Sequence, residues 1–368
     1  MMKKILIIAA CLFSITFVKV DTVLAIYDPR SLPNNVFGIH IVDSNDIPAA
    51  AALVNSAHNG SGDWGYVTLV ISQNDRNVEK WNTIFKDLGS RHLIPIVRLA
   101  TIAENSMWVA AKEEETSGWV DFLDSLSWPI QNRYVILFNE PNHRKEWGGV
   151  VDPKQYATIV DRFISSLKQK NHDFFILPAG LDLYAPNGFQ TMEATSFWAG
   201  MEESVPGILN KFDGWTSHSY PSHDYSGSAY ESGRYSINGY KWELEYISNQ
   251  FGVSSNLPVF ITETGWAQNP HLSRETIAQN YKIAFDEIWS QDASVVAVTP
   301  FLLNYQDGLF AKFSWKKLNS EEFYPQYHII RDLAKVLGEP LRVPLSKFGM
   351  LLHNEQAKKS SRYQAMLP

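Results

Sequence analysis

The chain has 368 residues, of which 45% are hydrophobic and 19% are charged, and its formal net charge at pH 7 is -7. This composition excludes a disordered or collagen-like protein and supplies enough apolar side chains for a large buried core. The negative charge, without any basic stripe, argues against binding to nucleic acid or to an anionic membrane surface. A neutral or polar partner is therefore favoured, and the 12 tryptophans suit a protein that stacks aromatic rings against flat ligand faces.

The first 25 residues have the three parts of a secretory signal peptide. Met1 to Lys4 is short and positive, Ile5 to Val18 is apolar, and Val23-Leu24-Ala25 resembles a signal-peptidase site. The apolar run is shorter than the roughly 20 residues of a membrane span, which favours cleavage and export over a retained membrane anchor. Cys11, the only cysteine, follows Ile8-Ala9-Ala10 in a weak resemblance to a bacterial lipidation box. A cleaved chain would have no disulfide and no thiolate chemistry, and would be secreted or held in the cell envelope.

Short apolar runs alternate with longer amphipathic stretches from Val36 onward. Eight runs are predicted to be strands: Val36–Ile41, Tyr66–Ile71, Leu93–Leu99, Tyr134–Asn139, Phe174–Ala179, Gly214–Ser219, Pro258–Glu263 and Val295–Phe301. Apolar residues at spacings of three and four predict helices that include Asn77–Leu88, Pro153–Lys170, Lys241–Phe251, Arg274–Ser290 and Glu321–Leu337. Eight such βα units predict an α/β fold, the (β/α)8 TIM barrel. A doubly wound open sheet is the alternative, but no glycine-rich dinucleotide-binding turn follows the first strand.

The pattern predicts a single catalytic domain. It covers residues 26–340, after the signal peptide at 1–25. The segment 341–368 breaks the alternation, and its Lys347, Lys358, Lys359 and Arg362 predict a basic tail that is partly disordered.

Two of the predicted strands run directly into a glutamate. Tyr134–Phe138 continues into Asn139-Glu140-Pro141, and Val259–Thr262 continues into Glu263-Thr264-Gly265. In a TIM barrel the chemistry takes place at the carboxyl ends of the strands, so both glutamates are expected on the same rim. Two carboxyl groups about 5 to 5.5 Å apart are what hydrolysis of a glycosidic bond with retention requires.

These motifs resemble those of the TIM-barrel retaining glycoside hydrolases whose catalytic glutamates end strands four and seven, and the resemblance covers about residues 36–340. The resemblance implies that Glu140 is the acid/base, that Glu263 is the nucleophile, and that Asn139 binds the sugar 2-hydroxyl. His218-Ser219-Tyr220 matches the His-Xaa-Tyr of strand six, whose tyrosine hydrogen-bonds the nucleophile. Arg98, at the end of the third strand, matches an arginine that supports the nucleophile.

The eighth strand departs from the family pattern. Many members end it with a tryptophan that floors the sugar subsite, whereas this chain has Thr299-Pro300-Phe301. Either Phe301, Tyr305 or Trp315 replaces this tryptophan as the floor of the subsite, or the substrate is held in a different way. Trp266 and Trp147 lie in predicted loops near the rim and are expected to contact or support the substrate.

The resemblance implies a secreted glycosidase that cleaves O-glycosidic bonds, β-linked in most of the superfamily, of a polysaccharide or oligosaccharide without a cofactor or a metal. The alternative is a carbohydrate-binding TIM barrel without activity, against which the retention of both glutamates argues. A metal-dependent hydrolase would need clustered ligands, but the ten histidines are scattered. Each of these residues could also have a purely structural role. Glu140 could be a surface residue in a turn, Arg98 could form a structural ion pair, and His218 and Tyr220 could be hydrogen-bonded core residues. A membrane partner is expected only if the signal segment is retained.

Overall fold

Eight parallel strands form the centre of the molecule, as the sequence predicts. The structure is a computed structural model that describes residues 26–56 and 62–343, so the predicted signal peptide and residues 344–368 of the predicted tail lie outside the described residues. The strands are β1 (Gly38–His40), β2 (Gly65–Ser72), β3 (Leu93–Ala100), β6 (Arg133–Ile136), β7 (Phe174–Leu177), β8 (Trp215–His218), β9 (Val259–Glu263) and β10 (Val295–Val298). A short hairpin, β4 (Ala103–Glu104) with β5 (Met107–Trp108), stands in the loop after β3.

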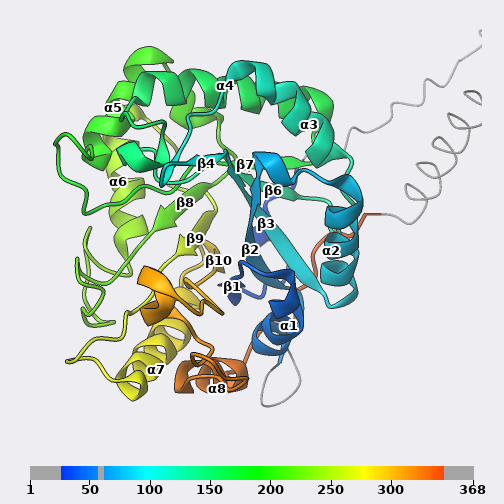
Figure 1. The fold of residues 1–368 in the computed structure, drawn as a ribbon, viewed down its shortest axis with the longest axis vertical. Helices are drawn as coiled ribbons and strands as arrows, with labels where there is room; N and C mark the ends of the chain where they lie inside the picture. The colour runs from blue at the N-terminus through cyan, green and yellow to red at the C-terminus, as the bar shows by residue number, and fades with distance from the viewer. Residues whose placement is uncertain (1–25, 57–61, 344–368) are drawn as a thin grey trace, which may run out of the picture.

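Helices surround the strands (Figure 1). They are α1 (Ile47–Asn55), α2 (Val78–Ser90), α3 (Thr116–Asp124), α4 (Pro153–Lys170), α5 (Ala194–Ser204), α6 (Gly239–Phe251), α7 (Arg274–Ile283) and α8 (Pro325–Asp332), with a π-helical turn at Ala284–Trp289 extending α7. The carboxylate of Asp152 accepts from the Gln155 backbone N–H and begins α4, with Pro153 in its first turn. The predicted helix Glu321–Leu337 is shorter in the structure, because Pro325 begins α8 and Leu333 is already extended.

The strands follow one another in chain order around the barrel, and two narrow seams close it. β1, β2, β3, β6 and β7 pair as one sheet, and β8, β9 and β10 pair as another. Single parallel bridges join the two sheets, between Phe37 and Val298 at one seam and between Asp182 and His218 at the other. At the first seam a Cβ on Gly38 would lie 2.6 Å from Thr299 Cγ2, so only glycine permits this approach. The expected (β/α)8 barrel is confirmed.

Aromatic side chains fill the lower part of the barrel. Tyr134 of β6 contacts Phe175 of β7 and Phe260 of β9, each with ring centroids 5.1 Å apart. Because β6 and β9 are not neighbours in the sheet, these rings must meet inside the barrel. Higher up, the hydroxyls of Thr68 on β2 and Thr299 just after β10 are 2.8 Å apart, with only β1 between these two strands. The interior is therefore a packed core below a polar upper layer, as TIM barrels require.

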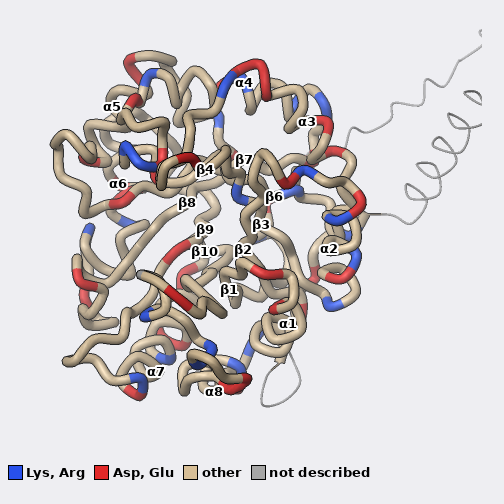
Figure 2. The backbone as a smooth tube through the Cα atoms, in the orientation of Figure 1, with Lys and Arg blue, Asp and Glu red and all other residues tan. Residues whose placement is uncertain are grey.

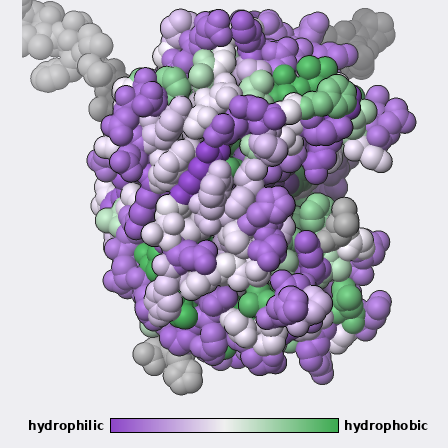
Figure 3. Space-filling model, turned by 90° about the vertical axis from the view of Figure 1, so that its left-hand side faces the viewer, coloured by the Kyte–Doolittle hydropathy of each residue, from purple (hydrophilic) through white to green (hydrophobic). Residues whose placement is uncertain are grey.

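The outer surface is polar and mixed in charge. Lys and Arg are interspersed with Asp and Glu around the outer helices (Figure 2). On the face shown in Figure 3 hydrophobic residues form small separate patches within a largely hydrophilic surface. Among the residues that the structure describes, none of the helices is long and apolar enough to cross a membrane.

Candidate active site

Glu140 stands on a strained turn just beyond β6. Phe138 has φ of 74° and Glu140 has φ of 30°, both in the left-handed region that residues other than glycine rarely adopt. Neighbouring backbone groups hold the turn, because the Glu140 N–H donates to Gly180 O at 3.2 Å and the His143 N–H donates to Glu140 O at 2.9 Å. Such backbone strain is often found at functional sites, where it fixes the direction of a side chain. The turn also explains why β6 ends at Ile136 rather than at Asn139.

Glu263 is the last residue of β9, and its side chain has two fixed donors. One carboxylate oxygen accepts from the Arg98 guanidinium, and the other accepts from the Tyr220 hydroxyl at 3.1 Å. Only 8% of Glu263 is exposed. Burial alone would raise the pKa of this carboxyl, but the positive charges of His218 and Arg98 outweigh burial and hold the pKa well below its usual range. Glu263 is therefore ionised at neutral pH.

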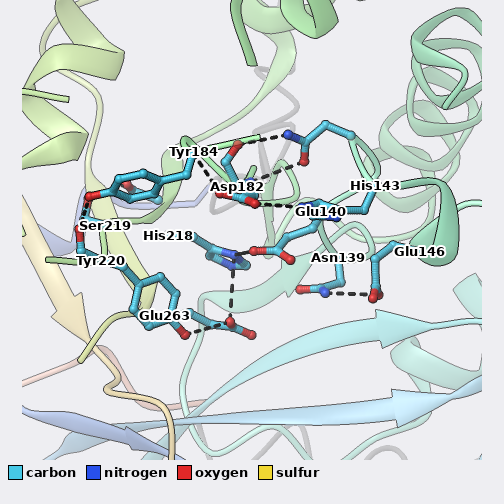
Figure 4. A network of polar contacts seen from close by, with 12 residues as sticks. Asn139, Glu140, His143, Glu146, Asp182, Tyr184, His218, Ser219, Tyr220 and Glu263 are labelled. Atoms are coloured by element: carbon cyan, nitrogen blue, oxygen red, sulfur yellow. Dashed lines mark hydrogen bonds and ion pairs between the residues drawn. The ribbon is translucent and has the colours of Figure 1, made fainter. Parts of the chain in front are cut away.

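His218 lies between the two glutamates (Figure 4). Its Nδ1 is 2.9 Å from Glu140 Oε1 and 3.9 Å from Glu263 Oε2. Burial would lower the pKa of His218, but the charges of Glu263 and Glu140 and the hydrogen bond to Glu140 raise it. Gly180 makes room for the imidazole, since a Cβ there would lie 2.3 Å from His218 Cδ2.

The two carboxylates approach each other closely. One oxygen of Glu140, one of Glu263 and a ring nitrogen of His218 all lie within 4.8 Å of one another. This separation is in the range used for direct attack on the anomeric carbon and below the roughly 6.5 to 9.5 Å that leaves room for a water. The three ligand atoms could also hold a metal ion, but Arg98 already places a fixed positive charge on Glu263. The donor set therefore suits a carbohydrate reaction better than a cation.

A first chain of hydrogen bonds extends from Glu263 through Arg98. Arg98 Nη1 donates to Asn139 Oδ1 at 2.7 Å, and Asn139 Nδ2 donates to Glu146 Oε2 at 3.2 Å. Burial, with the nearby charge of Glu140, raises the pKa of Glu146. These three side chains line a small cavity beside Glu140 and Glu263, together with Trp108 and Trp147. Glu146 was not predicted, because it lies within a loop and ends no strand.

A second group of hydrogen-bonded residues, His143, Asp182 and Tyr184, lies near Glu140. His143 Nε2 is 2.8 Å from Asp182 Oδ2, and Asp182 Oδ1 accepts from the Tyr184 N–H at 2.8 Å. Burial would lower the pKa of His143, but its hydrogen bond to Asp182 and the charge of Glu140 raise it. These residues were also missed. The sequence did carry a signal for Asp182, a polar residue shortly after the strand β7 and hence close to the same rim.

Trp147 and Trp266 are almost completely buried by the loops of the rim. Each is 1% exposed. Trp147 Nε1 donates to Gln155 Oε1 at 2.9 Å and its ring packs on Phe138, whereas Trp266 Nε1 donates to Gly227 O at 2.7 Å. Burial argues against a direct sugar contact by Trp266, whereas Trp147 lines the small cavity beside Asn139, so contact with or support of the substrate stays a prediction for Trp147. Their contacts support the loops of the rim.

An aromatic wall stands where the family has its strand-eight tryptophan. Trp315 is fully buried and so does not form it. Phe301 and Tyr305 are partly buried and belong to a cluster that also contains Tyr220 and Tyr225. The ring of Tyr225 packs edge-on against that of Tyr220, with centroids 5.0 Å apart, and burial and the charge of Glu140 raise the pKa of the Tyr225 hydroxyl to about 12. Tyr225 was not singled out from the sequence.

The family of the chain follows from comparison with known proteins. Residues 105–312, more than half of the chain, match the family described as the glycosyl hydrolase catalytic core. The chain belongs to this family, and the expectation of an enzyme that hydrolyses O-glycosyl compounds is confirmed. A search of the curated proteins found no match.

Solved structures share the fold at low sequence identity. A GH5_18 protein from Streptomyces cattleya in complex with GlcNAc is 15% identical, with a TM-score of 0.54 over 82% of this chain and 79% of that one. A GH39 β-xylosidase from Caulobacter crescentus is 13% identical, with a TM-score of 0.52 over 82% and 71%. A family 39 glycoside hydrolase from Bacteroides cellulosilyticus WH2 is 14% identical, with a TM-score of 0.50 over 83% of this chain. The chain spans 64% of the length of that last protein.

Proposed function

We propose that this protein hydrolyses β-linked oligosaccharides or polysaccharides by double displacement with retention of configuration, with Glu263 as nucleophile and Glu140 as acid/base. The observation that carries the proposal is the different environment of two carboxylates within 4.8 Å of each other. Glu263 has an arginine and a tyrosine as donors, which keep it charged. Glu140 has only the imidazole of His218 as side-chain partner among the described residues, and 20% of its side chain is exposed to an incoming substrate.

The chemistry proceeds in two steps on these residues. In the first, a carboxylate oxygen of Glu263 forms a bond to the anomeric carbon while the bond from that carbon to the departing oxygen breaks, and Glu140 gives its proton to this oxygen. In the second, Glu140 takes a proton from water, the water oxygen bonds to the anomeric carbon, and Glu263 leaves as carboxylate. Asn139, held by Arg98, would bind the 2-hydroxyl of the reacting sugar.

A β-linked glycan is the substrate class that the solved relatives suggest. These relatives include a β-xylosidase from Caulobacter crescentus and an endo-β-1,4-glucanase from Xanthomonas axonopodis pv. citri. The aromatic wall around Phe301 and Tyr225 is compatible with a pyranose, whose C–H face packs on aromatic rings.

Mutation with azide rescue tests the two assignments. Glu140→Ala should still form the glycosyl-enzyme from a dinitrophenyl β-glycoside, because that leaving group needs little proton assistance, but its second step should slow by about 10²- to 10⁴-fold. Azide should restore turnover and give a β-glycosyl azide, since azide needs no general base. Glu263→Ala should be almost inactive, and any azide product should be the α-glycosyl azide. Product anomers are assigned by NMR.

The control for these variants is Glu203→Ala, an exposed glutamate at the end of α5, which should retain wild-type turnover and not respond to azide. The opposite pattern of azide products would exchange the roles of Glu140 and Glu263. Full activity in both variants would instead favour a carbohydrate-binding barrel whose glutamates are not catalytic.

We further propose that the protein is exported and that residues 1–25 are removed. Support comes from the basic start, the apolar run and the Val23-Leu24-Ala25 exit. The N-terminal sequence of the protein recovered outside the cell should begin at Ile26. A protein that keeps Met1 and sediments with membranes would instead indicate an uncleaved anchor, and a lipid on Cys11 would indicate a lipoprotein.

A further inference from the structure

We propose that His143, Asp182 and Tyr184 form the subsite for the departing half of the substrate, and that this departing half is itself a sugar. The inference rests on the proposed function and adds to it the residues that bind the departing sugar. An enzyme with this subsite binds a departing sugar more tightly than a departing aryl group or simple alcohol.

The position of these residues relative to the two glutamates places them on the leaving-group side. Glu140 protonates the departing oxygen, so the departing group must lie against Glu140 rather than against Glu263. The chain of hydrogen bonds through Arg98 begins at Glu263. His143, in contrast, belongs to the turn of Glu140 and donates its backbone N–H to Glu140 O. In the view of Figure 4, Asp182 and Tyr184 lie on the side of Glu140 away from Glu263.

The charged pair retains capacity to bind hydroxyl groups. Asp182 accepts from the Tyr184 N–H and pairs with His143 Nε2, but a carboxylate has about four acceptor positions. Its side chain is 28% exposed, and that of His143 is 19% exposed. The free acceptor positions of the Asp182 carboxylate can accept hydrogen bonds from sugar hydroxyls. Hydrogen bonds of this kind, with a charged partner, are stronger than neutral ones.

Aromatic rings adjoin the charged pair. The ring of Tyr184 stacks on that of Tyr235, with centroids 4.7 Å apart and planes 29° apart, and the edge of His223 lies 5.8 Å away. Tyr235 is 50% exposed, and the Tyr184 hydroxyl donates to Tyr220 O at 3.2 Å, which fixes the ring next to the catalytic pair. An apolar ring surface beside convergent polar groups is what a pyranose needs, because its C–H face is apolar and its rim carries hydroxyls.

Kinetics on two kinds of substrate test the subsite. The probes are dinitrophenyl β-cellobioside and β-xylobioside, whose leaving group is not a sugar, and the matching cellotetraose and xylotetraose. Asp182→Asn should lower kcat/KM on the tetrasaccharide about tenfold more than on the aryl glycoside of the same sugar, as expected for the loss of a hydrogen bond to a charged group. Tyr184→Ala should shift the same ratio in the same direction, by about three- to tenfold.

The chain offers a matched control at the other end of the barrel. His92 Nδ1 is 2.9 Å from Asp63 Oδ1, and that oxygen also accepts from the backbone N–H of Trp64, as Asp182 does from Tyr184. Asp63 precedes β2 and His92 precedes β3, so this pair lies away from the catalytic rim. Asp63→Asn makes the same chemical change and should leave the ratio of the two kcat/KM values as in wild type.

A second readout does not depend on how much of a variant folds. With an aryl glycoside as donor and cellobiose or xylobiose as acceptor, the ratio of transfer product to hydrolysis product should fall about tenfold in Asp182→Asn, because the acceptor binds in the same subsite. Equal losses on both substrates, together with an unchanged transfer ratio, would overturn the subsite while leaving the proposed function intact. Failure of the wild type to hydrolyse any aryl glycoside or tetrasaccharide would overturn the proposed function and this inference with it.

Discussion

Glu140 and Glu263 have different hydrogen-bond partners, and this difference supports their assignment as acid/base and nucleophile. Glu263 is enclosed and has donors on both oxygens. Glu140 is more exposed and stands on a backbone turn with φ of 30°, next to His218. Since a fixed positive charge favours the ionised form, Arg98 keeps Glu263 charged, as the proposed role of nucleophile requires. His218 lies between the two groups, with its Nδ1 2.9 Å from Glu140 Oε1 and 3.9 Å from Glu263 Oε2.

Glu243 is a buried carboxyl group that the reaction does not use. It lies on α6, is fully buried, and burial raises its pKa to about 7 from the ordinary 4.5. The folded state therefore keeps a proton that the unfolded state has lost, and folding stability should fall as the pH rises from about 4.5 to 7. Glu243→Gln removes this dependence and should stabilise the protein at pH 8 by on the order of 3 kcal/mol relative to its effect at pH 4.

Urea unfolding of wild type and Glu243→Gln at the two pH values measures this effect. Glu245→Gln is the control, since Glu245 lies on the same helix with its side chain exposed, and it should change stability little at either pH. A Glu243→Gln effect of the same size at both pH values would show that burial does not shift this carboxyl.

The regular elements could be predicted because each carries its own local signal. All eight strands were found from short β-branched runs, and α4 was predicted with its observed bounds, since Asp152 and Pro153 mark its start. α1, α3 and α5 were not singled out. They are 9, 9 and 11 residues long, so few turns are available to show a periodic apolar face.

The residues of the candidate site that lie at strand ends could be predicted from the sequence, whereas those in loops could not. Arg98, Glu140, His218 and Glu263 lie in or just after strands, and the rule that barrel chemistry lies at the carboxyl ends of strands brings them together. Glu146 and His143 lie in a loop, whose path depends on tertiary contacts that the sequence does not display. The same cause explains Trp147 and Trp266, because whether a loop tryptophan faces a ligand or the core is decided by how the loop packs.

The whole barrel makes the site possible by bringing distant residues to one rim. Arg98 and Glu263 are 165 positions apart in the chain, yet they form an ion pair because parallel strands direct all their carboxyl ends to the same side. The aromatic core around Tyr134 fills the barrel below them and supports the polar layer. The opposite end of the strands carries structural contacts, such as the pair of His92 and Asp63.

Product stereochemistry is the measurement that tests the central claim most directly. The enzyme is incubated with a β-glycoside, and the anomeric protons of the released sugar are followed by NMR from the first minutes. Double displacement through Glu263 predicts that the β-anomer appears first and that the α-anomer accumulates later by mutarotation. First appearance of the α-anomer would mean a single displacement by water, and would contradict the assignment of Glu263 as nucleophile.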